Sequence, residues 1–128
     1  MGNAVREVKA MGSRKRKMLC TALVGGTGYP LLEILWRGRT HPTMAAAGAL
    51  SLCWMRICAP LPFRHSVRAA LACAGVVALE GMIGLLCNRK YRIWDYRGMR
   101  GNIRGQICPQ YALIWYALSY AGTFRKRK

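Results

Sequence analysis

The stretch Arg92–Cys108, RIWDYRGMRGNIRGQIC, decides how the fold is interpreted. Asp95, one of only four acidic residues in the chain, stands between Trp94 and Tyr96. Arginines crowd around it, and three glycines and an asparagine interrupt the segment. An uncharged stretch, residues 105–124, begins inside it and continues beyond it. We therefore expect a basic loop at a membrane surface, from which the chain returns into the bilayer.

The composition admits two classes of protein. The chain has 128 residues, which is the size of one domain, with 21 Lys and Arg against four acids and a net charge of +17. Hydrophobic residues nevertheless make up 53% of it. A basic nucleic-acid-binding domain spreads its charges along its faces, whereas here they stand in blocks. A small membrane protein with basic loops is therefore the better interpretation, and we expect no nucleic acid partner.

Four windows contain at most one charged residue each: 18–36, 40–55, 69–88 and 105–124. A helix needs about 20 mostly apolar residues to cross a hydrocarbon core of about 30 Å. The second window is short, but a basic side chain near its end can reach the surface and extend it. The sequence therefore predicts an all-α, polytopic membrane protein, with four transmembrane helices in a compact bundle at about 18–36, 43–59, 67–87 and 106–124.

The remaining segments are basic, and they set the expected orientation. Residues 1–17 form a basic N-terminal arm, residues 18–124 the transmembrane domain, and residues 125–128 a basic tail. Four crossings place both termini on one side, together with thirteen of the 21 basic residues. Because basic loops stay in the cytoplasm, we expect a multi-pass protein of the cell membrane with both termini cytoplasmic. The inverted orientation stays open.

Alternation of the helices brings three of the four acids to one membrane face. Glu33 ends the first predicted helix, Glu80 lies in the far half of the third, and Asp95 lies in the long loop. The candidates for a ligand site or pathway on this face are Glu33, Arg37, Arg39, His41, Glu80, Trp94, Asp95, Tyr96 and Asn102. The candidates for holding a phosphate or lipid headgroup are Arg92, Arg97, Arg100 and Arg104.

Two interpretations of this cluster stay open. In the structural one, Glu33 and Arg37 form a local helix pair and Glu80 holds the loop arginines. In the functional one, the two loops close a polar cavity that binds a ligand or passes an ion. No HExxH, GxxxxGK[ST], Ser–His–Asp order or paired-cysteine spacing occurs. The sequence thus predicts no cofactor and no metal, and it does not support an enzyme.

Two motifs resemble a known family. They are LEILWRGRTH at residues 32–41 and, further on, Glu80, Trp94-Asp95-Tyr96, Asn102-Ile103, Gly105-Gln106-Ile107-Cys108 and Trp115. They are similar to those of the small integral membrane proteins called Putative ABC-transporter type IV (CmpB-like). The resemblance implies a four-helix, permease-like transport component with a nucleotide-binding partner subunit.

We expect a homo-oligomer or a partnered protein, surrounded by anionic lipid. Four short helices enclose little volume, so a pathway is expected at a subunit interface. The alternative functions are a membrane protein or enzyme that binds lipid headgroups, and a non-catalytic membrane scaffold.

Overall fold

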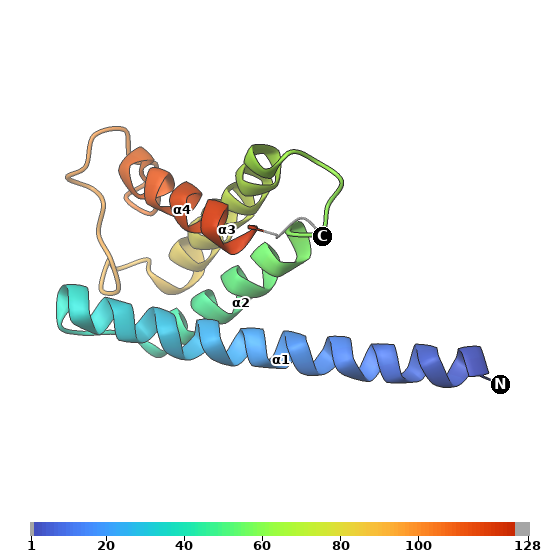
Figure 1. The fold of residues 1–128 in the computed structure, drawn as a ribbon. Helices are drawn as coiled ribbons and strands as arrows, with labels where there is room; N and C mark the ends of the chain where they lie inside the picture. The colour runs from blue at the N-terminus through green and yellow to red at the C-terminus, as the bar shows by residue number, and fades with distance from the viewer. Residues whose placement is uncertain (1, 125–128) are drawn as a thin grey trace.

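A computed structural model describes residues 2–124, and the predicted basic tail lies outside this range. Four helices make up the described chain: α1 Gly2–Arg37, α2 Pro42–Cys58, α3 His65–Cys87 and α4 Pro109–Gly122 (Figure 1). Within residues 2–124 the only β-type pairing is an isolated bridge between Ile103 and Ile107. The predicted all-α class is confirmed.

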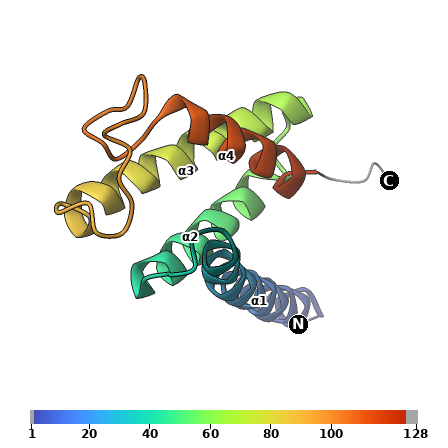
Figure 2. The same cartoon turned by 90° about the vertical axis from the view of Figure 1, so that its left-hand side faces the viewer.

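Each helix packs against its neighbour in the sequence. Helix α1 lies along α2, α2 packs against α3, and α3 packs against α4, with a smaller contact between α2 and α4. The N-terminal half of α1 extends well past the other helices in Figure 1, and Figure 2 looks nearly along α1. One end of the molecule therefore holds the long loop between α3 and α4, and the opposite end carries the free half of α1.

The structure supports two candidate membrane spans, not the four that were expected. By length and hydropathy, α1 and α3 could each cross a membrane. Helices α2 and α4 have only 17 and 14 residues. Helix α2 has the length expected from the sequence, whereas α4 is shorter than expected because it begins only at Pro109, a residue that lacks an N–H and suits the first helical turn. Residues 106–108, expected in the fourth helix, belong instead to the loop.

The predicted N-terminal arm is helical and continuous with α1. Residues 2–17 are exposed, yet they form the first turns of a helix 36 residues long, about 54 Å at the usual rise. The segment contains no proline and is rich in Ala, Arg, Lys, Glu and Met, which favour helix. The change from basic to apolar composition after residue 17 was interpreted as the start of the helix, but charge does not by itself end a helix.

Helices α1 and α2 cross at two glycines. A Cβ added at Gly25 would stand 2.8 Å from the Gly48 carbonyl carbon and 3.0 Å from the Leu52 Cβ. A Cβ at Gly48 would stand 3.1 Å from the Gly25 carbonyl carbon and 2.5 Å from the Tyr29 Cβ. Only glycine at both positions allows the backbones to approach this closely.

Gly25→Ala is expected to destabilise the fold by about 1–3 kcal/mol, because the added methyl group overpacks the crossing. Gly28→Ala is the matched control on the same helix, since nothing lies within 4 Å of a Cβ added there. That control is expected to be neutral or to stabilise by up to about 1 kcal/mol. Unfolding of the purified chain by SDS titration measures both. Equal changes in stability for the two variants would contradict close packing at the glycine crossing.

Candidate functional site

The arginine loop, residues 88–108, is organised by Asn88, which is only 1% exposed. Its side-chain oxygen accepts the backbone N–H groups of Ile93 and Trp94, at 2.8 and 3.3 Å. Its amide nitrogen donates to the Trp94 carbonyl at 2.6 Å and to the Gln106 side chain at 3.0 Å. One side chain thus joins the first turn of the loop to its last residues.

Gln106 completes this link from the other end of the loop. Its side-chain amide donates to the backbone carbonyl of Asn88 at 3.0 Å, and its backbone carbonyl accepts the Trp94 indole N–H at 2.9 Å. Gln106 packs on Gly84 of α3, where a Cβ would stand 2.9 Å from the Gln106 Cβ. These contacts hold the Trp94 side chain inward, and the side chains of both Trp94 and Tyr96 are buried.

A small, partly enclosed cavity, here called the polar cavity, lies between the loop and the helices. Its volume is about 30 Å³, room for one or two water molecules. Helices α1, α2 and α3 each contribute one face, with residues repeating at intervals of three or four, and α4 contributes one residue. The lining residues are Tyr29, Glu33, Arg37, Met44, Ala47, Ser51, Val76, Leu79, Glu80, Ile83, Trp94, Tyr96 and Trp115.

Glu80 is the polar group on the α3 face of this cavity. One carboxylate oxygen accepts the Tyr96 hydroxyl at 2.9 Å, and the other accepts the Trp115 indole N–H at 3.0 Å. Burial raises the pKa of Tyr96 well above its usual value, and the nearby Glu80 carboxylate raises it further. The Tyr96 hydroxyl therefore keeps its proton and serves Glu80 as a donor. Glu80 joins α3, α4 and the loop.

Glu33 and Arg37 face the same cavity from α1. Glu33 is buried, with its carboxylate 3.7 Å from the Arg37 guanidinium and 3.3 Å from the Thr40 hydroxyl, which donates to it. Arg37 also donates to the Ile93 carbonyl of the arginine loop at 3.4 Å. The cavity thus joins two carboxylates and one guanidinium from helices α1 and α3.

Four of the nine ligand or pathway candidates lie outside the polar cavity. Asp95 is exposed and forms a two-pronged pair with Arg97, at 2.9 and 2.7 Å. Arg39 and His41 are exposed in the α1–α2 turn, where His41 caps α2 by accepting the Thr43 N–H. Asn102 holds the loop together from within, through the Met99 carbonyl and the Gly105 N–H. The other five candidates line the cavity.

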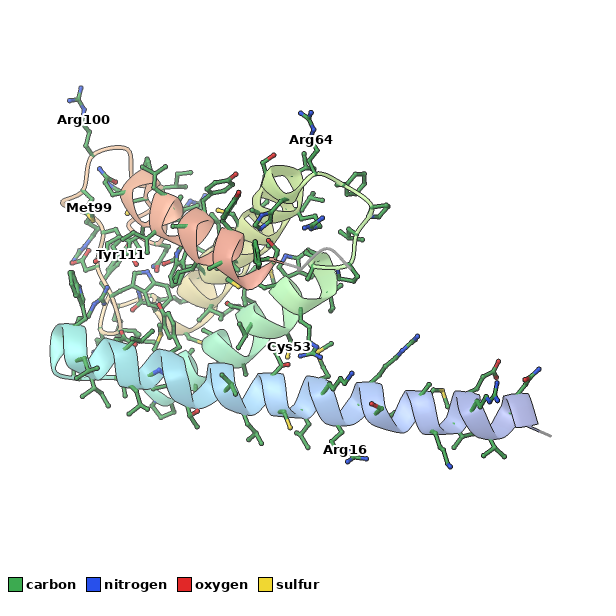
Figure 3. The ribbon with its side chains drawn as sticks, viewed as in Figure 1. Arg16, Cys53, Arg64, Met99, Arg100 and Tyr111 are labelled. Atoms are coloured by element: carbon green, nitrogen blue, oxygen red, sulfur yellow. The ribbon has the colours of Figure 1, made fainter. Side chains whose placement is uncertain are left out.

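The four arginines expected to hold phosphate all belong to the arginine loop. Arg92, Arg97, Arg100 and Arg104 are all exposed. Arg97 lies over the Tyr91 ring, 4.1 Å from its centroid, and is paired with Asp95. Arg100 points away from the body of the molecule (Figure 3). Among residues 2–124, no three His, Cys, Asp or Glu side chains gather as a metal site requires.

Several cavity and loop residues were not among the sequence candidates. Tyr29 precedes Glu33 by four residues, a spacing that places both on one helix face and that could have identified it. Trp115 stands in the motif that carries the family resemblance. Asn88 and Gln106 flank the loop, but nothing in the sequence pairs them. No sequence feature identified Ser51 as a cavity residue.

The Asp95–Arg97 pair predicts a pH dependence in the loop. Hydrogen bonds from Arg97 lower the pKa of Asp95 from 3.8 to about 2. Since the folded pKa is the lower one, the stabilisation is complete above pH 3.8 and is lost as the pH falls toward 2. Carboxyl NMR titration is expected to give a pKa near 2, and Arg97→Ala to return it toward 3.8. An unchanged pKa in the variant would contradict the pair.

Comparison with known proteins gave one match. The model of the family described as Putative ABC-transporter type IV matches residues 41–124, which include α2, α3, the arginine loop and α4. The matched range leaves α1 outside. No curated protein and no solved structure matches the chain.

Proposed function

Since the chain belongs to the Putative ABC-transporter type IV family, we propose that it is a small, permease-like membrane component of transport that binds or passes a small ion at Glu80. One observation carries the proposal: a carboxylate stands within an apolar helix and faces a small, partly enclosed cavity shared with Glu33 and Arg37. Acidic residues within membrane helices are costly and commonly mark ion or proton pathways.

A membrane location is supported by what the helices expose. Helices α1 and α3 are long and apolar enough to span a bilayer. Large apolar side chains of α1 and α3 face outward, more than most soluble proteins tolerate. They include Leu19, Leu23, Val24, Leu31, Leu32, Leu35, Met82 and Leu86. A multi-pass arrangement in the cell membrane, with both termini cytoplasmic, is part of this proposal.

The proposal also includes partners. A cavity of about 30 Å³ holds water but no larger solute, so a wider pathway would lie between this chain and a second copy or another subunit. The sequence contains no phosphate-binding loop of its own. ATP-driven transport would therefore use a separate nucleotide-binding subunit, as the family description suggests.

Proton flux into liposomes tests the proposal. The purified chain is reconstituted in vesicles that enclose the pH dye pyranine, and a valinomycin-clamped potassium gradient drives proton entry. We expect wild-type vesicles to acidify faster than empty ones, and Glu80→Gln to reduce the excess rate at least tenfold. The amide keeps hydrogen-bonding capacity but cannot exchange a proton in this range.

Glu7→Gln is the matched control, because Glu7 is an acid exposed on the free half of α1, away from the cavity. It is expected to leave the rate unchanged. Wild-type vesicles no faster than empty ones would overturn proton passage at Glu80. Equal loss in the two variants would show that charge in general, and not the cavity, sets the rate.

A further inference from the structure

A second hollow lies at the other end of the helices from the arginine loop. It is open to the surrounding medium and has a volume of about 450 Å³, and α1, the end of α2 and the end of α4 contribute its lining. This size is in the range of small-molecule sites. We call it the basic hollow, and its lining residues are Arg16, Lys17, Cys20, Thr21, Val24, Leu52, Arg56, Ala59 and Gly122.

The lining changes from basic to apolar along the helix axes. Lys17 is the last residue of the basic half of α1, and the apolar stretch begins at Met18. On α2, Arg56 lies two residues before the helix end, beyond the apolar Leu52. Both cations therefore stand at the level where the apolar surfaces of their helices end. In a membrane, this is the level of the phosphate groups.

Arg56 is positioned to bind an anion. Its guanidinium donates to the Thr21 hydroxyl at 2.9 Å, and that hydroxyl donates to the Lys17 carbonyl at 2.8 Å. The rest of the Arg56 side chain is exposed. Within residues 2–124 the ion pairs are Glu33–Arg37 and Asp95–Arg97, so neither Lys17 nor Arg56 has a carboxylate partner there. Arg16 also lines the hollow, but its side chain points away from α2 in Figure 3, so we assign the phosphate to Lys17 and Arg56.

We propose that the basic hollow binds one anionic phospholipid, with the headgroup phosphate on Lys17 and Arg56 and an acyl chain along Val24 and Leu52. Basic pockets between helices at the cytoplasmic side bind anionic headgroups in this way. A free phosphate would bind the two cations without contacting the apolar wall. A lipid with a neutral headgroup would contact the apolar wall but gain little from the cations. The inference rests on the membrane location proposed above. It does not involve Glu80.

Native mass spectrometry of the full chain in detergent tests the inference. The probes are dioctanoyl phosphatidylglycerol, dioctanoyl phosphatidylcholine and inorganic phosphate. We expect one phosphatidylglycerol per chain, saturably, with at least roughly tenfold weaker binding of phosphatidylcholine. Inorganic phosphate at the same concentration is expected not to compete. Equal binding of the two lipids, or competition by phosphate, would overturn a phospholipid site.

Variants locate the site. Lys17→Ala with Arg56→Ala is expected to weaken phosphatidylglycerol binding roughly tenfold or more. Arg14→Ala with Arg64→Ala removes the same charge from exposed positions outside the hollow, and Arg64 points away from the helices in Figure 3. This control is expected to change binding less than twofold. Equal weakening of phosphatidylglycerol binding in the two double variants would indicate diffuse attraction to the basic face and would overturn the site.

Two further variants keep the charge. Cys20→Trp fills the hollow from α1, where Cys20 is exposed, and is expected to abolish binding although every cation remains. Lys17→Arg with Arg56→Lys is expected to bind within about threefold of wild type, and thermal unfolding without lipid checks that each variant folds. Binding that survives Cys20→Trp would overturn the hollow as the site. Because proton flux is not measured, the result is separate from the test of Glu80.

Discussion

Asn88→Leu is expected to cost about 3–5 kcal/mol, the largest loss of any single substitution considered. Leucine has a similar size but can neither donate nor accept. The Ile93 and Trp94 N–H groups and the Gln106 side chain would lose their partner inside a buried region. Each unsatisfied buried group costs about 1–3 kcal/mol, and several share this one side chain.

The loss is expected to be concentrated in the arginine loop. Hydrogen exchange of the Ile93 and Trp94 amides would rise strongly, while the amides of α1 change little. Gln110→Leu is the matched control, because Gln110 also bonds a loop carbonyl, that of Arg100 at 3.1 Å, but is exposed. It is expected to cost less than about 0.5 kcal/mol. A loop that stays protected in Asn88→Leu would contradict the central role of Asn88.

Glu80→Leu is expected to cost about 2–5 kcal/mol, the second largest effect. Trp115 N–H is a donor only, so without Glu80 it has no acceptor, and the Tyr96 hydroxyl loses its acceptor as well. Both rings are buried. The leucine methyl groups offset some of this loss by apolar contact with Val76 and Ile83, their neighbours on the same face of α3.

Glu80→Gln separates stability from function. The glutamine oxygen can accept from Trp115, and its amide can donate to the Tyr96 hydroxyl, so the expected cost is about 1 kcal/mol. SDS unfolding followed by tryptophan fluorescence compares the two variants with Glu7→Gln, which is expected to lie within about 0.5 kcal/mol of wild type. Equal losses for Leu and Gln would show that the hydrogen bonds to Trp115 and Tyr96 contribute little.

The helices were largely predictable because their determinants are local. Windows with at most one charge predicted the number of helices and most of their ends, since this signal is read within each segment alone. Errors arose where a local signal was over-interpreted. The basic arm was separated from α1 although its residues favour helix, and α4 was extended through Cys108 although Pro109 begins it.

The meeting of Glu33, Glu80, Trp94 and Tyr96 at one cavity was expected from helix alternation, and the geometry agrees. Asp95 was expected with them. Neighbours in an irregular loop point in different directions, and Asp95 faces outward to Arg97 while Tyr96 faces inward to Glu80. No periodicity exists in such a loop, so a sequence pattern could not distinguish the two side chains.

The sequence by itself determined the all-α class, the apolar character of the helices and the end of the molecule at which the acids gather. These depend on composition and on the spacing of residues along one helix. Only the tertiary structure decided which groups pair. The Asn88–Gln106 link spans the whole arginine loop, and Tyr91 and Arg104 within it adopt positive φ values of 55° and 53°. Such a backbone is unfavourable for these residues alone, so long-range hydrogen bonds and packing must hold it.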